Sequence, residues 1–397
     1  MSKRDDHSKA FTRRDFIKAS STMAVGLAFL GKSPAQTSKA VASSSGVKVQ
    51  TVLGPIAPDE LGVTIMHEHC PVIDWSEFFG HPVAPISSSL RGEIVNRAVG
   101  SIKEWKSLMA ELGTQSTIVE CTPMRCGRYP DLIAEVARKS GINIVAVTGF
   151  FGEELAPMHP WGIEMLMQRN GIDKVAQVYI KEIRHGMDDP YEKPGYNYTS
   201  IKAGIIKTAT NTYLTYLERL AATAAAQASV ETGSAITTHT ARGGGLELAQ
   251  LLLANGVKPN RIIIGHQGYL DDRKNERATD YHKRLLDMGV FVQFDRLAFE
   301  KEIGFYAKYP LENRAEFIKP LVDAGYEDQL VMSHDAFPYF YTSYGTEEKP
   351  ESDWWYAMKR PYSPIFAVVI PKLLEGGVSE SVIRKILIEN PKRALAI

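Results

Sequence analysis

Six residues whose side chains can take part in a metal centre are spread along the chain, each inside or just after a short apolar or β-branched run. They are His67, His69, Lys207, His239, His266 and Asp335. Imidazole nitrogens and carboxylate oxygens bind zinc, manganese, cobalt and iron. His67 and His69 are two residues apart, so in an extended segment both imidazoles lie on one face and can hold one cation. Taken singly, His67 and His69 are more often ordinary polar residues, His239 and His266 are more often hydrogen-bonded core histidines, and Asp335 could be a helix cap.

Lys207 follows the apolar residues Ala203-Gly204-Ile205-Ile206. An ammonium group there would be costly to bury and would be repelled by nearby cations. We therefore expect the neutral amine to capture carbon dioxide and become N6-carboxylysine, an anion whose two oxygens can bridge two metal ions. The alternative is a buried lysine that pairs with an acid.

The segments that carry these residues predict a (β/α)8 TIM barrel. Beyond Leu53, short β-branched runs alternate with longer amphipathic segments, which is typical of βα units around a parallel sheet. Strands are expected at 62–66, 116–120, 142–148, 203–208, 234–238, 261–265, 290–294 and 330–333, and helices at segments that include 93–112, 213–232, 246–255 and 315–324. Because the C-terminal ends of barrel strands carry the chemistry, the six residues should meet there around a binuclear metal centre.

The composition favours a small-molecule partner. Lys plus Arg and Asp plus Glu both number 46, so no net charge favours nucleic acid or an acidic membrane surface. A length of 397 residues is compatible with one large barrel domain. Cys70, Cys121 and Cys126 do not make a disulfide framework and are expected to be buried thiols, although a bridge between Cys121 and Cys126 stays open.

The N-terminus has the pattern of an export signal. Residues 12–18 read Thr-Arg-Arg-Asp-Phe-Ile-Lys and precede a moderately apolar run at 20–30 and small residues around Ala35 and Ala40, which is typical of a twin-arginine signal. The run is shorter than the roughly 18 apolar residues needed to span a bilayer, so we expect no stable membrane insertion after signal removal. We assign 1–46 to signal and flexible joint outside the fold, 47–397 to the barrel, and predict a periplasmic or secreted location.

Motifs spread over nearly the whole chain resemble one known family. They are Val52-Leu53-Gly54-Pro55, Glu60-Leu61-Gly62, Met66-His67-Glu68-His69, Ala203-Gly204-Ile205-Ile206-Lys207, Ile264-Gly265-His266, Ser333-His334-Asp335 and Ile388-Glu389-Asn390-Pro391. The chain is similar to the phosphotriesterase-like members of the amidohydrolase superfamily, which include phosphotriesterases, phosphotriesterase-like lactonases and phosphotriesterase-related proteins. The resemblance implies that His67, His69 and Asp335 hold one metal and that His239 and His266 hold the other, with carbamylated Lys207 bridging. Zinc, the usual metal, and a homodimer are also implied.

This set of residues predicts direct hydrolysis. Two cations about 3.5–4 Å apart can share a water, lower its pKa towards about 7 and polarise the bond under attack. We expect a bridging hydroxide as the nucleophile, and Asp335 as the group that accepts and passes on its proton. No Ser or Cys elbow accompanies these residues, so no acyl-enzyme is expected.

Lactones or carboxylic esters are the expected substrates, with organophosphate triesters as promiscuous ones. Residues 265–268, Gly-His-Gln-Gly, and Asp295-Arg296 are similar to the lactonase-type members. Arg296 is a candidate for orienting the substrate, although a structural ion pair explains it equally well. Against a lactonase, those members carry a tyrosine near the end of the third strand, where this chain has Thr148-Gly149-Phe150-Phe151.

Aromatic residues complete the expected substrate site. Phe151, Trp354 and Trp355 are candidate contacts, the two tryptophans within a segment at 337–355 that could form a lid or an apolar pocket. The same aromatic residues could instead pack the segment onto the barrel or a partner subunit. Phosphotriester hydrolysis as the main activity and an exported ligand-binding protein of the same fold without significant turnover are the alternatives, because a fold does not prove an activity.

Overall fold

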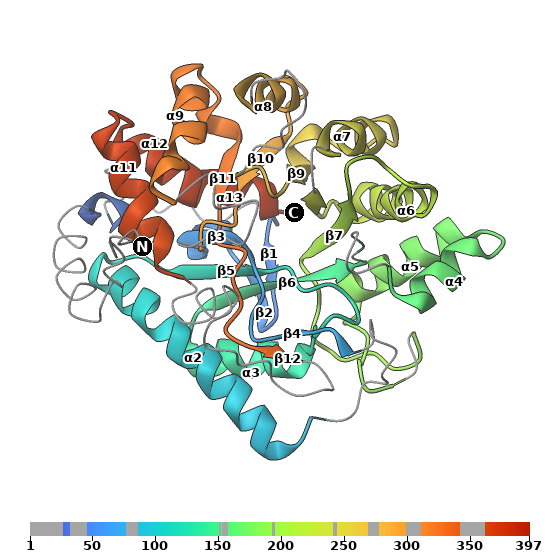
Figure 1. Ribbon diagram of the computed structural model, residues 1–397. Coiled ribbons are helices and arrows are strands. Elements are labelled where there is room, and N and C mark those ends of the chain that lie inside the picture. Colours follow the sequence, from blue (N-terminus) through green and yellow to red (C-terminus); the bar gives the residue numbers. More distant parts are fainter. Residues whose placement is uncertain are drawn as a thin grey trace, which may run out of the picture.

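Eight parallel strands curve into a nearly closed barrel that is surrounded by helices (Figure 1). The computed structural model describes residues 27–31, 46–76, 86–150, 152, 158–192, 195–240, 244–268, 278–298, 311–341 and 362–397. The strands are β3 Val63–Glu68, β5 Ser116–Glu120, β6 Asn143–Gly149, β7 Ile205–Thr210, β8 Ile236–Thr240, β9 Ile262–Ile264, β10 Phe291–Phe294 and β11 Leu330–Met332. Their order in the sheet is β11-β10-β9-β8-β7-β6-β5-β3. The predicted (β/α)8 barrel is confirmed.

The helices lie outside the strands, and some of them begin at a residue whose side chain caps the first turn. They include α2 Ser88–Glu111, α3 Pro130–Ser140, α4 Pro160–Met167, α5 Gly171–Arg184, α6 Tyr216–Thr232, α7 Gly245–Ala254, α8 Ala278–Leu286, α9 Ala315–Asp323, α11 Ile370–Glu375, α12 Glu380–Arg384 and α13 Asn390–Leu395. At the start of α6, the hydroxyl of Thr215 and the carboxylate of Glu218 each accept the other residue's backbone N–H, and Gly233 ends the helix at φ +79°. Such reciprocal caps and left-handed glycines fix helix ends. The four helices that we expected are confirmed.

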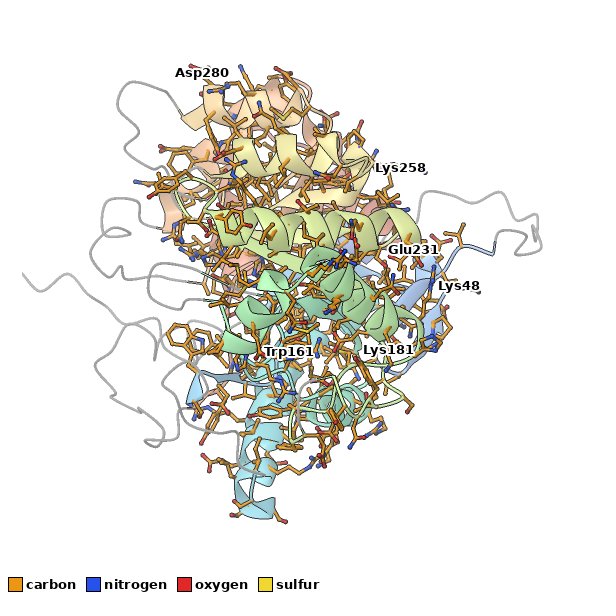
Figure 2. All side chains as sticks on the ribbon, turned by 90° about the vertical axis from the view of Figure 1, so that its right-hand side faces the viewer. Lys48, Trp161, Lys181, Glu231, Lys258 and Asp280 are labelled. Atoms are coloured by element: carbon orange, nitrogen blue, oxygen red, sulfur yellow. The ribbon has the colours of Figure 1, made fainter. Side chains whose placement is uncertain are left out.

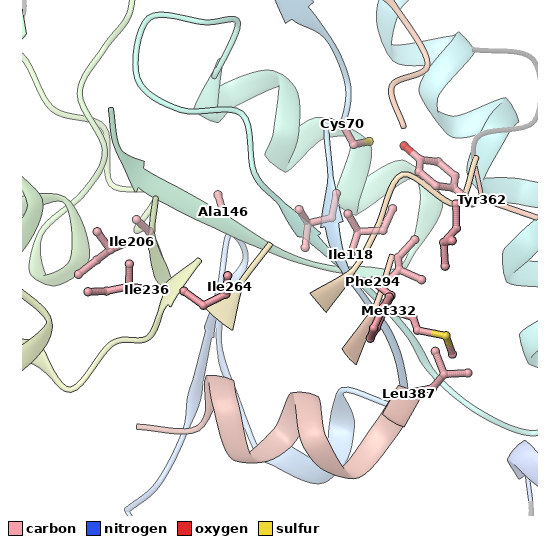
Figure 3. Packing of buried hydrophobic residues seen from close by; sticks show 14 of the residues in the cluster. Cys70, Ile118, Ala146, Ile206, Ile236, Ile264, Phe294, Met332, Tyr362 and Leu387 are labelled. Atoms are coloured by element: carbon pink, nitrogen blue, oxygen red, sulfur yellow. The ribbon is translucent and has the colours of Figure 1, made fainter. Parts of the chain in front are cut away.

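Alternate residues of the strands belong to two separate apolar layers. Ile118, Ala146, Ile206, Ile236 and Ile264 belong to the outer layer between sheet and helices (Figure 3). A second cluster takes the neighbouring positions of the same strands, among them Val119, Val147, Ile205, Ile263, Phe291 and Val331. Since side chains alternate along a strand, this second cluster fills the barrel interior. Lys207 lies two residues beyond Ile205 and therefore also points inward.

The N-terminal end of the barrel is closed by the first and last segments of the domain. The hairpin of β1 Val49–Thr51 and β2 Gly54–Ile56 lies there with α13. Lys48 and Ile397 exchange two backbone hydrogen bonds, of 2.8 and 2.9 Å, and Leu395 packs in the inner cluster. The opposite, C-terminal end is therefore the open mouth.

Part of the expected export signal contacts the barrel. Leu27, Phe29 and Leu30 are buried, and Arg384 of α12 donates a hydrogen bond of 2.7 Å to the carbonyl of Leu30. We expected residues 1–46 to lie outside the fold; within this range, the apolar side chains of this short turn are buried beside α12. The boundary at residue 46, the export route and the location stay predictions. Within the described ranges, no helix is both long enough and apolar enough to cross a bilayer.

All three cysteines are free and buried. Cys121 and Cys126 are thus not bridged, and the expectation of buried thiols is confirmed. Burial raises the pKa of the Cys70 and Cys121 thiols, so both are neutral thiols at pH 7.

A buried histidine outside the barrel mouth makes stability depend on pH. His282 on α8 is 2% exposed, and burial lowers its pKa from 6.5 to about 4. His282 takes up a proton at higher pH in the unfolded chain than in the folded chain. The stabilising contribution of the neutral, buried His282 is therefore complete above pH 6.5 and is lost as the pH falls towards 4. Over that window we expect urea denaturation to show that the wild type loses roughly 3 kcal/mol more of its free energy of unfolding than His282→Leu does. Equal slopes in both proteins would contradict this assignment.

Candidate metal centre

The structure brings all six predicted residues together at the mouth of the barrel. Lys207 Nζ lies 2.7 Å from His67 Nε2, and His69 Nε2 lies 3.1 Å from Asp335 Oδ1. His266 Nε2 and His239 Nδ1 are 2.6 Å apart. The two halves of the cluster are joined because His67 Nε2 is 3.8 Å from Asp335 Oδ1 and His266 Nδ1 is 3.9 Å from Asp335 Oδ2.

Three of the residues at the strand ends adopt an unusual backbone conformation. His266, Arg296 and Asp335 have φ values of +58°, +62° and +56°. The left-handed region disfavours side chains other than glycine and asparagine, so such residues persist only where surrounding contacts enforce them. These turns direct the side chains back over the mouth instead of along the following loops.

Asp295 orients two of the imidazoles. Its Oδ1 lies 2.7 Å from His266 Nδ1, and its Oδ2 lies 3.2 Å from His67 Nδ1. Gln293 Nε2 donates to the same Oδ2 at 2.5 Å. An Nδ1–H that donates to a carboxylate leaves the lone pair of Nε2 for a cation, the usual arrangement around metal-binding histidines.

His69 is held in the same way by a hydroxyl group. Its Nδ1 lies 2.9 Å from Thr122 Oγ1, while Nε2 faces Asp335. The backbone N–H of Thr122 donates to Glu120 Oε1 at 2.9 Å, and burial raises the pKa of Glu120 to about 8. Three of the four imidazoles therefore have one nitrogen engaged by a neighbour and the other turned to the centre of the cluster.

Among the residues that the structure describes, two groups of side chains have potential ligand atoms that all lie within 4.8 Å of one another inside the group. The first is His67, His69 and Asp335, as predicted, and the second is His67, His266 and Asp295. The second group contains Asp295 where His239 was expected. Since Asp295 contacts Nδ1 atoms on the sides of the rings that face away from Lys207 and His239, we assign it to orientation and keep His239 as the partner of His266.

Burial and charge set the protonation of the cluster. Burial is the main cause that lowers the pKa of His67 to about 4, followed by the charge of Lys207. Burial also lowers the pKa of Lys207 and of His266. For Asp335, burial acts to raise the pKa, but His266 and the hydrogen bond with His69 outweigh it and hold the pKa well below its usual range. Burial thus favours the neutral forms of His67 and His266, and Asp335 is ionised, the forms that bind cations.

The donor set fits divalent transition metals. Four imidazoles and a carboxylate suit zinc, manganese, cobalt or iron. Lys207 is 1% exposed and has no place among such cations as an ammonium, but it fits once the amine carries carbon dioxide. These residues could thus hold metal ions, with Asp295, Gln293 and Thr122 fixing the rings.

The predicted substrate residues are placed less fully. Arg296 donates from Nε to Asp335 Oδ2 at 3.1 Å, so the ion-pair alternative holds and its substrate role stays a prediction. Phe150 packs against Trp161 and Tyr179, with ring centroids 5.5 and 5.8 Å away. It therefore lies outside the barrel interior. Phe151, Trp354 and Trp355 lie outside the described residues.

Sequence reasoning missed the orienting role of Asp295 and the involvement of Gln293 and Thr122. One signal was available: Gln293 and Asp295 are two residues apart at the end of a predicted strand, so they lie on the same face beside the histidines. Thr122 had no such signal, because its contact with His69 depends on the packing of β5 against β3.

We expect Asp295→Asn to weaken metal binding by about 10- to 100-fold, because outer partners of ligand histidines contribute effects of that size. The measurement is the residual metal content after dialysis against increasing concentrations of a chelator. Asp74→Asn is the control, because Asp74 is an equally buried carboxylate that accepts hydrogen bonds from Ser76 and Tyr129. Equal metal retention in the two variants would show that Asp295 has no orienting role.

Comparisons with known proteins agree with this geometry. The family model described as "Phosphotriesterase family" matches residues 47–395. A phosphotriesterase homology protein of Mycobacterium tuberculosis is 31% identical over 350 residues, which cover 87% of this chain and 97% of the relative. A phospho-furanose lactonase of Mycoplasmopsis synoviae is 31% identical over 354 residues, with coverages of 87% and 91%.

A solved structure has the same fold. The organophosphorus hydrolase from Deinococcus radiodurans superposes with a TM-score of 0.74 at 26% identity, and the match covers 88% of this chain and 96% of that one. The matches span nearly the whole barrel, and the relatives are hydrolases. The chain therefore belongs to the phosphotriesterase family and is a hydrolase.

Proposed function

We propose that this protein is a binuclear metal-dependent hydrolase of lactones or carboxylic esters, with organophosphate triesters as secondary substrates. The observation that carries the proposal is the position of Lys207. Its amine lies inside the barrel, 1% exposed and 2.7 Å from His67 Nε2, at the junction between the predicted pairs of ligands. A carbamate formed there would present one oxygen to each pair.

His67, His69 and Asp335 would hold one cation and His239 and His266 the other, with Lys207 as N6-carboxylysine between them. Bound there, two divalent cations, with zinc as our first choice, would lower the pKa of a hydrolytic water and polarise the substrate's oxygen. Asp335 is ionised and 13% exposed, so it is suited to accept the proton that the water loses and to pass it to solvent.

Two relatives support this substrate class. One is named a phospho-furanose lactonase and one an organophosphorus hydrolase, so the fold and ligand set are compatible with attack at carbonyl and phosphoryl centres. Arg296, 18% exposed beside Asp335, offers a guanidinium at the mouth that can orient an ester oxygen. The segment Thr148-Gly149-Phe150-Phe151 contains no tyrosine where lactonase-type members carry one, so this chain must orient the substrate without that phenol.

The test is a kinetic survey of the purified, zinc-loaded protein with lactones, aryl esters, phosphotriesters and amides under the same conditions. We expect the highest kcat/KM with a lactone or carboxylic ester and a lower value with phosphotriesters. Chelation should abolish all activities together, and Asp335→Asn should remain inactive after metal is added.

The other outcomes separate the alternatives. The highest kcat/KM with a phosphotriester would make phosphotriester hydrolysis the main activity. Saturable binding of lactones without turnover in the metal-loaded protein would support a binding protein and overturn the proposal. Activity that survives complete metal removal would overturn it as well.

A further inference from the structure

The first and last strands of the barrel meet at a seam that carries half of the cluster. Within the ranges that the structure describes, no ladder of strand pairing joins β3 to β11. Instead, the N–H of His67 donates to Ser333 Oγ at 2.6 Å. The N–H of Asp335 donates to the carbonyl of His67 at 3.0 Å, and the N–H of His69 donates to the carbonyl of Ala336 at 2.8 Å. The segments 67–69 and 333–336 are therefore fastened to each other directly.

Glu68 is the side chain at the centre of this seam. It lies between the two histidines in sequence, and alternation turns it to the opposite side from them. It is fully buried and accepts four hydrogen bonds from the facing segment. The donors are Ser333 Oγ at 2.7 Å, the backbone N–H of His334 at 2.9 Å, His334 Nδ1 at 2.9 Å and the backbone N–H of Ala336 at 3.0 Å.

These contacts surround Asp335 on both sides. Its neighbours, His334 and Ala336, both donate their backbone N–H groups to Glu68, one to each carboxylate oxygen. Asp335 itself has φ +56°, a conformation that an aspartate keeps only when its surroundings impose it. The carboxylate of Glu68, which accepts from the backbone N–H groups on both sides of Asp335, supplies that constraint.

We propose that Glu68 is a positioning residue, an anionic clamp across the barrel seam that aims Asp335 at the imidazoles of His67 and His69. The inference rests on the proposed function, because the clamp matters to catalysis only if these residues hold a cation. Among the described residues, Glu68 accepts hydrogen bonds from Ser333, His334 and Ala336 and from none of the candidate metal ligands, so it acts on Asp335 through segment 333–336. Glutamine has the same shape, but its amide nitrogen cannot accept from a backbone N–H.

The experiment compares the full-length wild-type protein with Glu68→Gln and Glu218→Gln. Glu218 is a buried glutamate that caps α6 through hydrogen bonds to Thr215, so its substitution reports a general loss of stability. We expect Glu68→Gln to bind cobalt about 10- to 100-fold more weakly and to shift the visible absorption of the cobalt complex. Glu218→Gln should lower the urea midpoint and leave both cobalt properties unchanged.

A second measurement does not depend on metal or turnover. In the metal-free protein, the amides of His334 and Ala336 should exchange hydrogen faster in Glu68→Gln than in wild type. Should Glu68→Gln fail to fold, Ser333→Ala takes its place, since it removes the bonds from Ser333 to Glu68 and from His67 to Ser333. It should change cobalt affinity and exchange in the same direction.

Unchanged exchange at 334 and 336, or cobalt affinity and absorption equal to wild type, would overturn the clamp. A wild-type protein that binds no cobalt would overturn the proposed function and the positioning role together. Cobalt binding that is sensitive to Glu68→Gln, without hydrolysis of any substrate in the survey, would support the clamp while the proposed function fails.

Discussion

Replacing Lys207 by methionine is expected to remove metal binding and hydrolysis together. Methionine fills the same space among Ile205, Cys121 and the imidazoles but cannot carry carbon dioxide, so the two pairs of ligands lose their shared anion. We expect kcat to fall by at least about 10³-fold, since loss of a single electrostatic partner of the transition state already costs 10²- to 10³-fold. Metal content per chain and kcat measured on the same samples test this.

Lys202→Met is the matched control, because Lys202 precedes β7 by three residues and lies outside the cluster. It should keep full metal content and activity. Carbon dioxide gives an independent test: metal uptake by the metal-free wild type should accelerate with added bicarbonate and slow in its absence. A Lys207→Met protein that retains two metals and full activity would remove the basis of the proposed function.

Among the substitutions that we propose, replacing Arg128 by methionine should cause the largest loss of stability. Arg128 makes two hydrogen bonds to Glu182, of 2.6 and 2.7 Å, and their side chains are 2% and 0% exposed. Removing the guanidinium leaves the charge of Glu182 buried without its partner. The free energy of unfolding should drop by about 3–5 kcal/mol, as measured by urea denaturation.

The surface pair of Arg184 and Glu231 provides the comparison. These residues lie 2.7 Å apart with side chains 48% and 46% exposed, and Glu231 points outward from α6 (Figure 2). Arg184→Met should cost no more than about 1 kcal/mol, because water screens an exposed pair. The double variant Arg128→Met/Glu182→Met should regain part of the loss. A loss for Arg128→Met as small as that for Arg184→Met would show that the buried pair adds nothing.

Much of the barrel and the grouping of the six candidate residues could be predicted from local patterns. The eight strands are marked by short β-branched runs, and the six candidate residues come together because strand ends meet at one mouth. Residues such as His239 gain their meaning only from that placement, since singly they resemble core histidines.

The remaining features depend on contacts between distant segments. Asp295 reaches both His67 and His266, and Glu68 reaches Ser333 across 265 residues of sequence. No local pattern encodes such distances. The hydrogen bond from Arg384 to the carbonyl of Leu30 is of the same kind, because the apolar run of the predicted export signal carries no mark of the helix that it contacts.

The left-handed turns at His266, Arg296 and Asp335 limit how this protein can be engineered for heat resistance. Glycine would relax each backbone, yet it would delete a side chain at the mouth, so the gain in durability would come at the expense of turnover. Asn170 adopts the same conformation at φ +59°, before α5 and away from the cluster. Rigidifying substitutions are therefore better directed to the outer helices than to the rim where the strands end.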